Sequence, residues 1–159
     1  MTRGRSKLVE IQHGWIGLVG SSTHQLTLKS LLKNKADQED FSTVDGIFET
    51  LLSFQRTLTT DYFLQEEEPD EEQPYNSCQM TGLVCTRNGI FGFGSYREVC
   101  EYERFWAIGS GDTLAIGAMH AAYDLYTDPE EIARIGALAA CEFDSLCGPP
   151  VESKSITLS

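Results

Sequence analysis

Residues 107–119 read Ala107-Ile-Gly-Ser-Gly-Asp-Thr-Leu-Ala-Ile-Gly-Ala-Met119, and this segment is the strongest indication of the fold. The preceding Phe105-Trp-Ala-Ile108 has the apolar character of a short buried strand. The glycines of the Gly-Ser-Gly that follows allow a sharp turn. Apolar and small residues then recur at helical spacing from Leu114 onward. The sequence therefore predicts a short strand that turns directly into a helix.

The next start signal is Asp128-Pro129-Glu130-Glu131, which offers an N-cap aspartate, a proline at the first helical position and glutamates in the first turn. It predicts an alanine-rich helix from 129 to about 144, ended by Gly148-Pro-Pro150. The tail over 151–158 alternates apolar and polar residues, which predicts a closing strand.

Toward the N-terminus, residues 7–19 predict a hairpin around a turn at His13-Gly14. Helices are predicted over about 23–34 and, with Gly46 as a weak point, over 44–63. A second hairpin is predicted over 80–93, around Arg87-Asn88-Gly89. Because strands and helices occur in blocks, we expect an α+β fold in which antiparallel sheets lie between helix layers in αββα order, as one domain over 1–159.

The composition of the chain disfavours several classes of partner. Twelve Lys plus Arg against twenty-four Asp plus Glu give a formal charge of -12, which disfavours nucleic acid and anionic membranes as partners. The acidic segment 65–74 is interpreted as a solvated loop, with a docking tail for a basic partner as the alternative. We find no signal peptide or spanning segment, and the five irregularly spaced cysteines suggest neither disulfides nor zinc, so we expect a cytoplasmic protein without metal or cofactor.

Three segments together resemble the proteasome β-subunit and HslV-type branch of the N-terminal nucleophile (Ntn) hydrolases. Residues 107–119 resemble that family's Ile-Gly-Ser-Gly turn and following helix. Residues 128–149 resemble its last helix and Asp-x-x-Ser-Gly ending, with Cys147 in place of the serine. The third segment, residues 7–20, resembles the strand pair that follows the family's catalytic lysine.

The resemblance implies a four-layer Ntn sandwich and a threonine-type peptidase, in which an N-terminal hydroxyl attacks a peptide carbonyl and its own α-amine serves as base. By position, Lys7 matches the lysine that favours the deprotonated nucleophile, and Ser110, Asp144 and Cys147 match the cluster around the terminal amine. Gly20 matches the turn whose backbone N–H stabilises the oxyanion. The family also implies a homo-oligomeric ring, an ATP-dependent unfoldase partner and peptide or unfolded-protein substrates.

Each residue also has a plainer interpretation: Lys7 as a strand-edge charge, Ser110 as a helix cap, Asp144 as a surface acid and Cys147 as a small apolar residue. The family's nucleophile strand would lie upstream of Lys7, where six residues are too few for a hairpin, so we expect an N-terminally truncated and inactive chain. Thr2 is a poor substitute, because its spacing to Lys7 does not match the family.

Two other functions are kept open: a non-catalytic structural or assembly subunit of such a ring, and a binding domain that reuses the fold. A nucleophilic pairing of Cys147 with His13, His24 or His120 is a further alternative, although the three histidines form no recognisable arrangement with it.

Overall fold

The computed structural model describes residues 6–34, 39–62 and 80–156. The chain divides into two compact units, 1–102 and 103–159, and each is described by itself. The described residues hold five strands and four helices, so the α+β class predicted from the sequence is confirmed. The acidic segment 65–74 lies outside the described residues.

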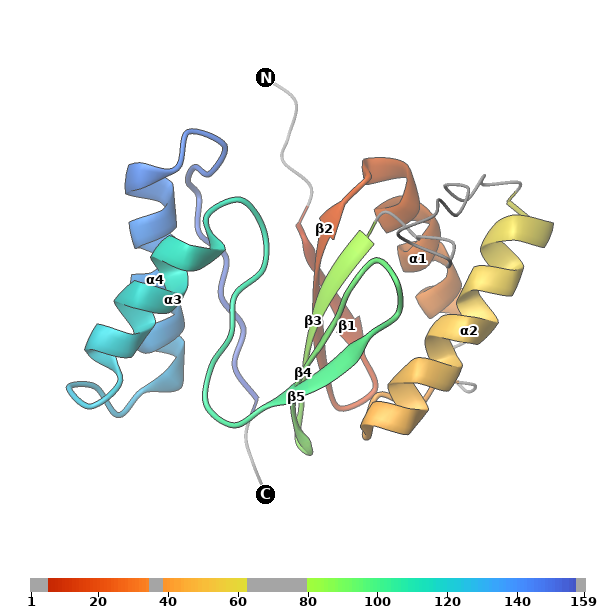
Figure 1. Cartoon of the computed structure of the whole chain (residues 1–159), viewed down its shortest axis with the longest axis horizontal. Helices are drawn as coiled ribbons and strands as arrows, with labels where there is room; N and C mark the ends of the chain where they lie inside the picture. The colour runs from red at the N-terminus through yellow and green to blue at the C-terminus, as the bar shows by residue number, and fades with distance from the viewer. Residues whose placement is uncertain (1–5, 35–38, 63–79, 157–159) are drawn as a thin grey trace, which may run out of the picture. The chain divides into compact units, whose positions relative to one another are not determined.

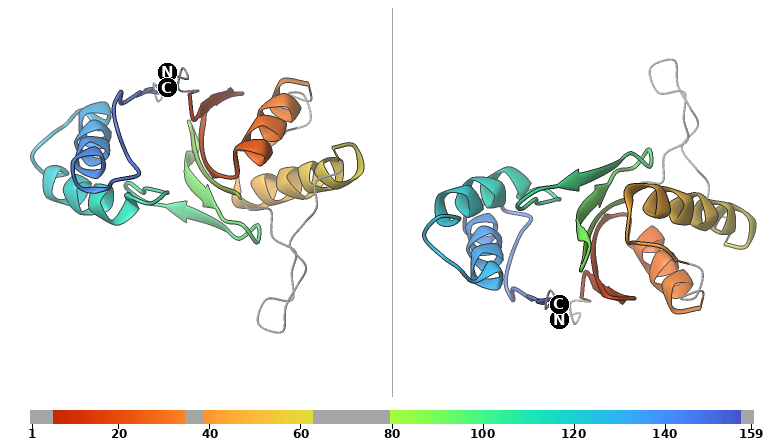
Figure 2. Two further views of the ribbon diagram at one scale, coloured as in Figure 1. Left: turned by 90° about the horizontal axis from the view of Figure 1, so that it is seen from above. Right: turned by 90° about the horizontal axis from the view of Figure 1, so that it is seen from below.

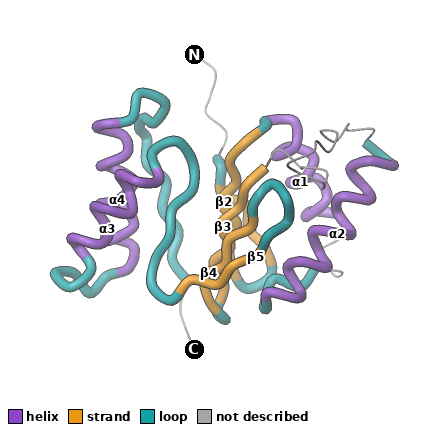
Figure 3. The backbone as a smooth tube through the Cα atoms, in the orientation of Figure 1, coloured by secondary structure: helices purple, strands orange, loops and turns teal. Residues whose placement is uncertain are grey.

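The strands of the first unit, orange in Figure 3, form one sheet. Neighbouring strands pair antiparallel and follow chain order. Its strands are β1 (Leu8–Ile11), β2 (Gly14–Gly20), β3 (Met80–Thr86), β4 (Gly89–Phe93) and β5 (Val99–Tyr102). Both predicted hairpins are confirmed, although the first turn lies one residue earlier than predicted, because Ile11 pairs with Gly14. Gly14 therefore belongs to a strand, where a side chain would meet the Cys85 carbonyl oxygen at 2.1 Å.

Two helices, α1 (Ser22–Asn34) and α2 (Val44–Thr60), cover one face of this sheet (Figures 1 and 2). Strand residues Ile16 and Val84 and helix residue Ile47 have no exposed surface at all, as expected when alternate strand residues and one helix stripe face the same core. Thr43 caps α2 by accepting a hydrogen bond from the Gly46 amide at 3.0 Å. Gly46 leaves room for the Asp40 carboxylate, which a Cβ would meet at 2.3 Å.

The second unit is built on α3 (Asp112–Ala122) and α4 (Pro129–Phe143), which pack side by side (Figure 1). Asp128 caps α4 as predicted, accepting from the Glu130 amide at 2.9 Å. At the crossing, Gly136 lies against Met119 and the Ala115 carbonyl.

Two predicted strands do not form. Residues 105–108 have no strand pairing, and the Phe105 ring instead contacts Tyr123, with ring centroids 5.3 Å apart. Residues 151–156 are also not a strand, since Ser153 hydrogen-bonds the Glu130 carboxylate of α4 at 2.7 Å; 157 and 158 lie outside the described residues. One strand that was not predicted, β5, does form.

Among the described residues no helix is long and apolar enough to cross a membrane. In the same ranges, no group of three or more His, Cys, Asp or Glu side chains is arranged to hold a metal ion. The four described cysteines are free thiols.

Candidate functional site

Three of the predicted site residues meet in the second unit. The Cys147 thiol donates to Asp144 Oδ2 at 3.1 Å, and Ser110 Oγ lies 3.8 Å from Cys147 Sγ. Ser110 precedes α3, whereas Asp144 and Cys147 follow α4, so the packing of the two helices brings the three side chains together. We name Ser110, Asp144 and Cys147 the polar cluster.

The turn before α3 presents Ser110 to this cluster. Gly109 has φ of 110°, a conformation that favours glycine, and its carbonyl accepts from the Asp112 amide at 3.2 Å. Gly111 is buried against the cluster, where a Cβ would lie 2.7 Å from Ala140 Cβ, 3.1 Å from Cys147 Sγ and 3.3 Å from Asp144 Oδ2. Gly111 was not predicted as a site residue, yet its missing side chain lets the turn approach α4.

Asp144 is the C-cap residue of α4, and its amide donates to the Ala140 carbonyl at 2.9 Å. Its Oδ1 accepts from the Leu146 amide at 3.0 Å. Hydrogen bonding from Ser110, then from the Leu146 amide and the Cys147 thiol, lowers the pKa of this carboxyl below its ordinary value. Asp144 is therefore a fixed anion at neutral pH.

Cys147 is the donor in its bond to that carboxylate. The hydrogen bond to Asp144, with a smaller contribution from burial, raises the pKa of the Cys147 thiol. A thiol held in its protonated form is a poor nucleophile. Its hydrogen-bond partners in the described part of the chain are Asp144 and Ser110, so the geometry does not support pairing with a histidine.

The other two predicted residues, Lys7 and Gly20, lie in the first unit, at neighbouring ends of β1 and β2. The Lys7 carbonyl accepts from the Leu18 amide at 3.1 Å, and the Lys7 side chain is exposed. Gly20 has φ of 110°, and its carbonyl accepts from Gln25 Nε2 at 3.0 Å. Lys29 of α1, which the sequence analysis did not select, donates from Nζ to the Ser6 carbonyl beside Lys7.

Comparisons with known proteins show which family has this fold and sequence. No family model matches the sequence, and no curated protein matches it significantly. A structure of Thiobacillus denitrificans BPH in complex with epoxomicin is 32% identical, with a TM-score of 0.87 over 97% of this chain and 80% of that one. A second structure of Thiobacillus denitrificans BPH is 33% identical, with a TM-score of 0.86 over 96% of this chain and 80% of that one.

A third structure, eukaryotic HslV from Trypanosoma brucei, shares the fold at 24% identity, with a TM-score of 0.62 over 89% of this chain and 75% of that one. The Ntn type of α+β fold predicted from the three sequence segments is thereby confirmed. With a relative more than 30% identical over most of both chains, and with this shared fold, the chain belongs to the proteasome-like, HslV-type family of Ntn hydrolases.

Proposed function

We propose that this proteasome-like subunit serves a threonine-type peptidase, and that the polar cluster holds the α-amine of the N-terminal nucleophile. The observation that carries the proposal is Asp144, an anion kept ionised by donors from a turn and from a helix end. A fixed carboxylate with two adjacent side-chain hydroxyl or thiol groups suits an ammonium group, which has three N–H donors.

In the proposed reaction, the nucleophile's hydroxyl attacks the peptide carbonyl carbon while its α-amine accepts the hydroxyl proton. The resulting ammonium is stabilised by Asp144, and the proton passes to the departing amine of the substrate. The acyl-enzyme ester is then hydrolysed by water. Lys7 would favour the deprotonated nucleophile, and the Gly20 N–H would stabilise the oxyanion. None of these steps requires a metal or an organic cofactor.

The Thiobacillus structure in complex with epoxomicin supports this assignment. We propose that the present chain binds the same compound, acts on peptides or unfolded proteins, and works as a homo-oligomeric ring served by an ATP-dependent unfoldase. Phe143 and Leu146 flank Asp144 and are 74% and 81% exposed, which fits burial by a neighbouring subunit. A cytoplasmic location remains part of this proposal.

The first test is the mass of the N-terminal peptide of the native protein from its source, together with hydrolysis of a fluorogenic peptide. A mature terminus upstream of Met1, at a Thr, Ser or Cys, together with hydrolysis is expected. Asp144→Asn should then lower kcat/KM at least tenfold, because the ammonium loses its counter-charge. Glu142→Gln is the matched control, since Glu142 is an exposed acid of α4 outside the cluster and should leave hydrolysis unchanged.

A native chain that starts at Met1 or Thr2 and hydrolyses nothing would instead support a non-catalytic ring subunit. A monomer without hydrolysis would favour a binding domain. Either result refutes the peptidase proposal.

A further inference from the structure

Strand β5 forms one edge of the sheet in the first unit, and no strand of the described chain lies beyond it. Edge strands offer unpaired backbone groups to other chains, and many proteins block them with proline, lysine or a capping side chain. The opposite edge, β1, is partly blocked, because the Ser6 hydroxyl accepts from the Leu8 amide at 3.1 Å and donates to the Leu8 carbonyl at 3.2 Å. β5 contains neither proline nor lysine. Within the first unit, β5 is therefore the unblocked edge.

The register of β5 shows which backbone groups face outward. The Gly94 amide donates to the Glu98 carbonyl at 3.1 Å, so this pair is hydrogen-bonded across the β4–β5 turn. Bonded and non-bonded pairs alternate along an antiparallel ladder. Val99 and Glu101 therefore occupy non-bonded positions opposite β4. Their N–H and C=O groups point away from β4, toward the open edge.

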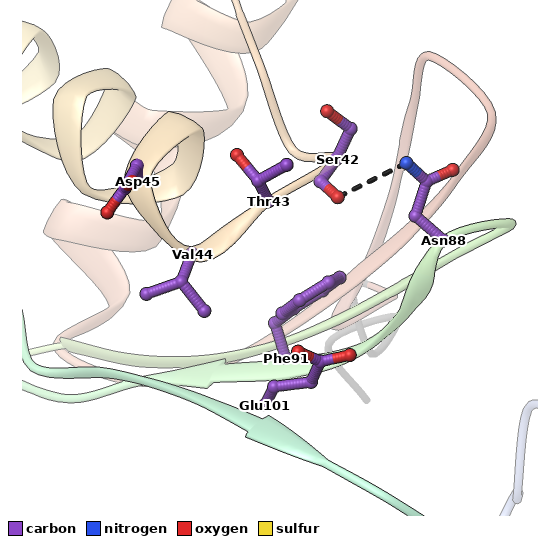
Figure 4. Close-up of a pocket in the computed structure, with 7 residues that line it drawn as sticks. All are labelled: Ser42, Thr43, Val44, Asp45, Asn88, Phe91 and Glu101. Atoms are coloured by element: carbon purple, nitrogen blue, oxygen red, sulfur yellow. Dashed lines mark hydrogen bonds between the residues drawn. The ribbon is translucent and has the colours of Figure 1, made fainter.

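The side chains of β5 alternate between the two faces of the sheet. Val99 packs against the core under α2, and Glu101 lies on the same side, beside Phe91 and the start of α2 (Figure 4). Cys100 therefore points to the opposite face of the sheet, where its thiol is exposed and free. The middle of the open edge thus carries an accessible thiol.

We propose that β5 pairs antiparallel with β5 of a second copy of this chain, about a two-fold axis at Cys100. Outward-pointing backbone groups must face outward-pointing groups, and they belong to alternate residues. A two-fold axis must therefore lie at a residue and not between two residues. This contact would form whether or not the chain hydrolyses peptides.

Charge and strand length select the position of the axis. An axis at Glu101 would set two Glu101 carboxylates directly opposite each other, and an axis at Tyr102 would oppose Glu101 with Glu103; like charges in such pairs are destabilising. An axis at Val99 would carry the pairing into the β4–β5 turn. With the axis at Cys100, Glu101 faces Val99 of the second copy, and each such pair exchanges both backbone hydrogen bonds.

The axis at Cys100 has a geometric consequence that can be measured. Cys100 would face its own copy in a non-bonded pair, where Cα atoms lie about 4.5 Å apart. Disulfides span Cα distances of about 4.4–6.8 Å, so oxidation would link the two thiols without moving the backbone. Diamide is a suitable oxidant, since it takes two electrons and two protons from the thiol pair, forms the S–S bond and becomes the hydrazine.

The first experiment treats the full chain, in the assembly that it forms, with diamide. We expect a covalent dimer on a gel run without reductant, and mass spectrometry should find Cys100 linked to Cys100. Cys100→Ser should abolish this dimer. Cys85→Ser is the matched control, because Cys85 is also exposed but lies on the interior strand β3, and it should leave the dimer unchanged. The proposal fails if no Cys100–Cys100 link forms, or if links through Cys85 are as frequent.

A second experiment tests the pairing without oxidation. The axis duplicates any charge at position 100, so Cys100→Lys would set two ammonium groups opposite each other, whereas Cys100→Ser stays neutral. In residue-resolved hydrogen exchange, the Val99 and Glu101 amides should exchange at least about tenfold faster in Cys100→Lys than in Cys100→Ser. The β3 amides serve as the internal control for general destabilisation and should not differ. Equal exchange at Val99 and Glu101 in the two variants, or an equal acceleration in β3, would overturn the proposal.

Discussion

Alanine at either of two helical glycines tests the packing that positions the polar cluster. Gly117 of α3 has no atom within 4 Å of its would-be Cβ, whereas a Cβ on Gly136 of α4 would lie 2.7 Å from Met119 Cγ and 3.0 Å from the Ala115 carbonyl oxygen. Alanine is preferred over glycine inside a helix by about 1 kcal/mol. Gly117→Ala should therefore raise the free energy of unfolding by about 0.5–1 kcal/mol.

Gly136→Ala gains the same helix preference but overpacks the crossing of α3 and α4. Met119 can rotate, but the Ala115 carbonyl is backbone and can move only with its helix. With a typical overpacking cost of about 2 kcal/mol, Gly136→Ala should be destabilised by about 1 kcal/mol, roughly 2 kcal/mol below Gly117→Ala. That difference corresponds to a Tm difference of about 4–8 °C for a chain of this length.

Urea unfolding followed by circular dichroism, at one fixed protein concentration, measures both variants against the parent chain. Equal stability of the two alanine variants would refute the packing of α3 on α4. The same result would leave the proximity of Ser110, Asp144 and Cys147 unexplained, because that proximity depends on the packing of α3 against α4.

Three further perturbations follow from individual residues. Burial raises the pKa of Glu39 to about 7, and its buried Oε1 has no hydrogen-bond partner among the described groups. The free energy of unfolding should therefore fall by about 1 kcal/mol as the pH rises from 4.5 to 7, a modest loss because the carboxylate stays partly solvated. Glu39→Gln should flatten this dependence, measured as Tm against pH. Thr43→Ala removes the cap of α2 and should cost about 1 kcal/mol in urea unfolding, whereas Thr43→Ser should recover most of it. Cys147→Val should raise the pKa of Asp144 in an NMR titration and Cys147→Ser should leave it low; equal pKa values would exclude the thiol as a donor.

Local chemistry explains why the helices were predictable. The Asp128-Pro129 start signal placed the beginning of α4 at the correct residue, because a cap and a fixed φ are encoded within a few positions. The 80–93 hairpin was predictable for the same reason, since its turn residues are adjacent in sequence.

The failures occurred where distant residues decide the outcome. The apolar run 105–108 has the sequence pattern of a buried strand. It forms no strand in the structure, where the Phe105 ring packs against Tyr123, a residue distant in sequence. Strand β5 was missed because its residues are half-buried or exposed and include Glu101, so no alternation marks it. Gly14 looked like a turn residue, although its function is to let β3 approach.

The family resemblance selected Ser110, Asp144 and Cys147 as site residues. No local sequence pattern, however, predicts that the turn before α3 lies close to the end of α4. Their proximity, the close approach at Gly111 and the direction of the Cys147 hydrogen bond are set by the packing of α3 on α4. Lys29 gave no sequence signal, because the Ser6 carbonyl that it contacts comes from a distant segment of the chain.

The cysteine at position 147 bears on the electrostatics of the proposed amine site. A hydroxyl there could not ionise near neutral pH, whereas a thiol could in principle add a second negative charge beside Asp144. The carboxylate prevents this by raising the pKa of the thiol, so Cys147 donates a hydrogen bond as the family's serine would. The polar cluster then carries one negative charge, which matches the single positive charge of an N-terminal ammonium. Cysteine at this position is therefore compatible with the proposed peptidase chemistry.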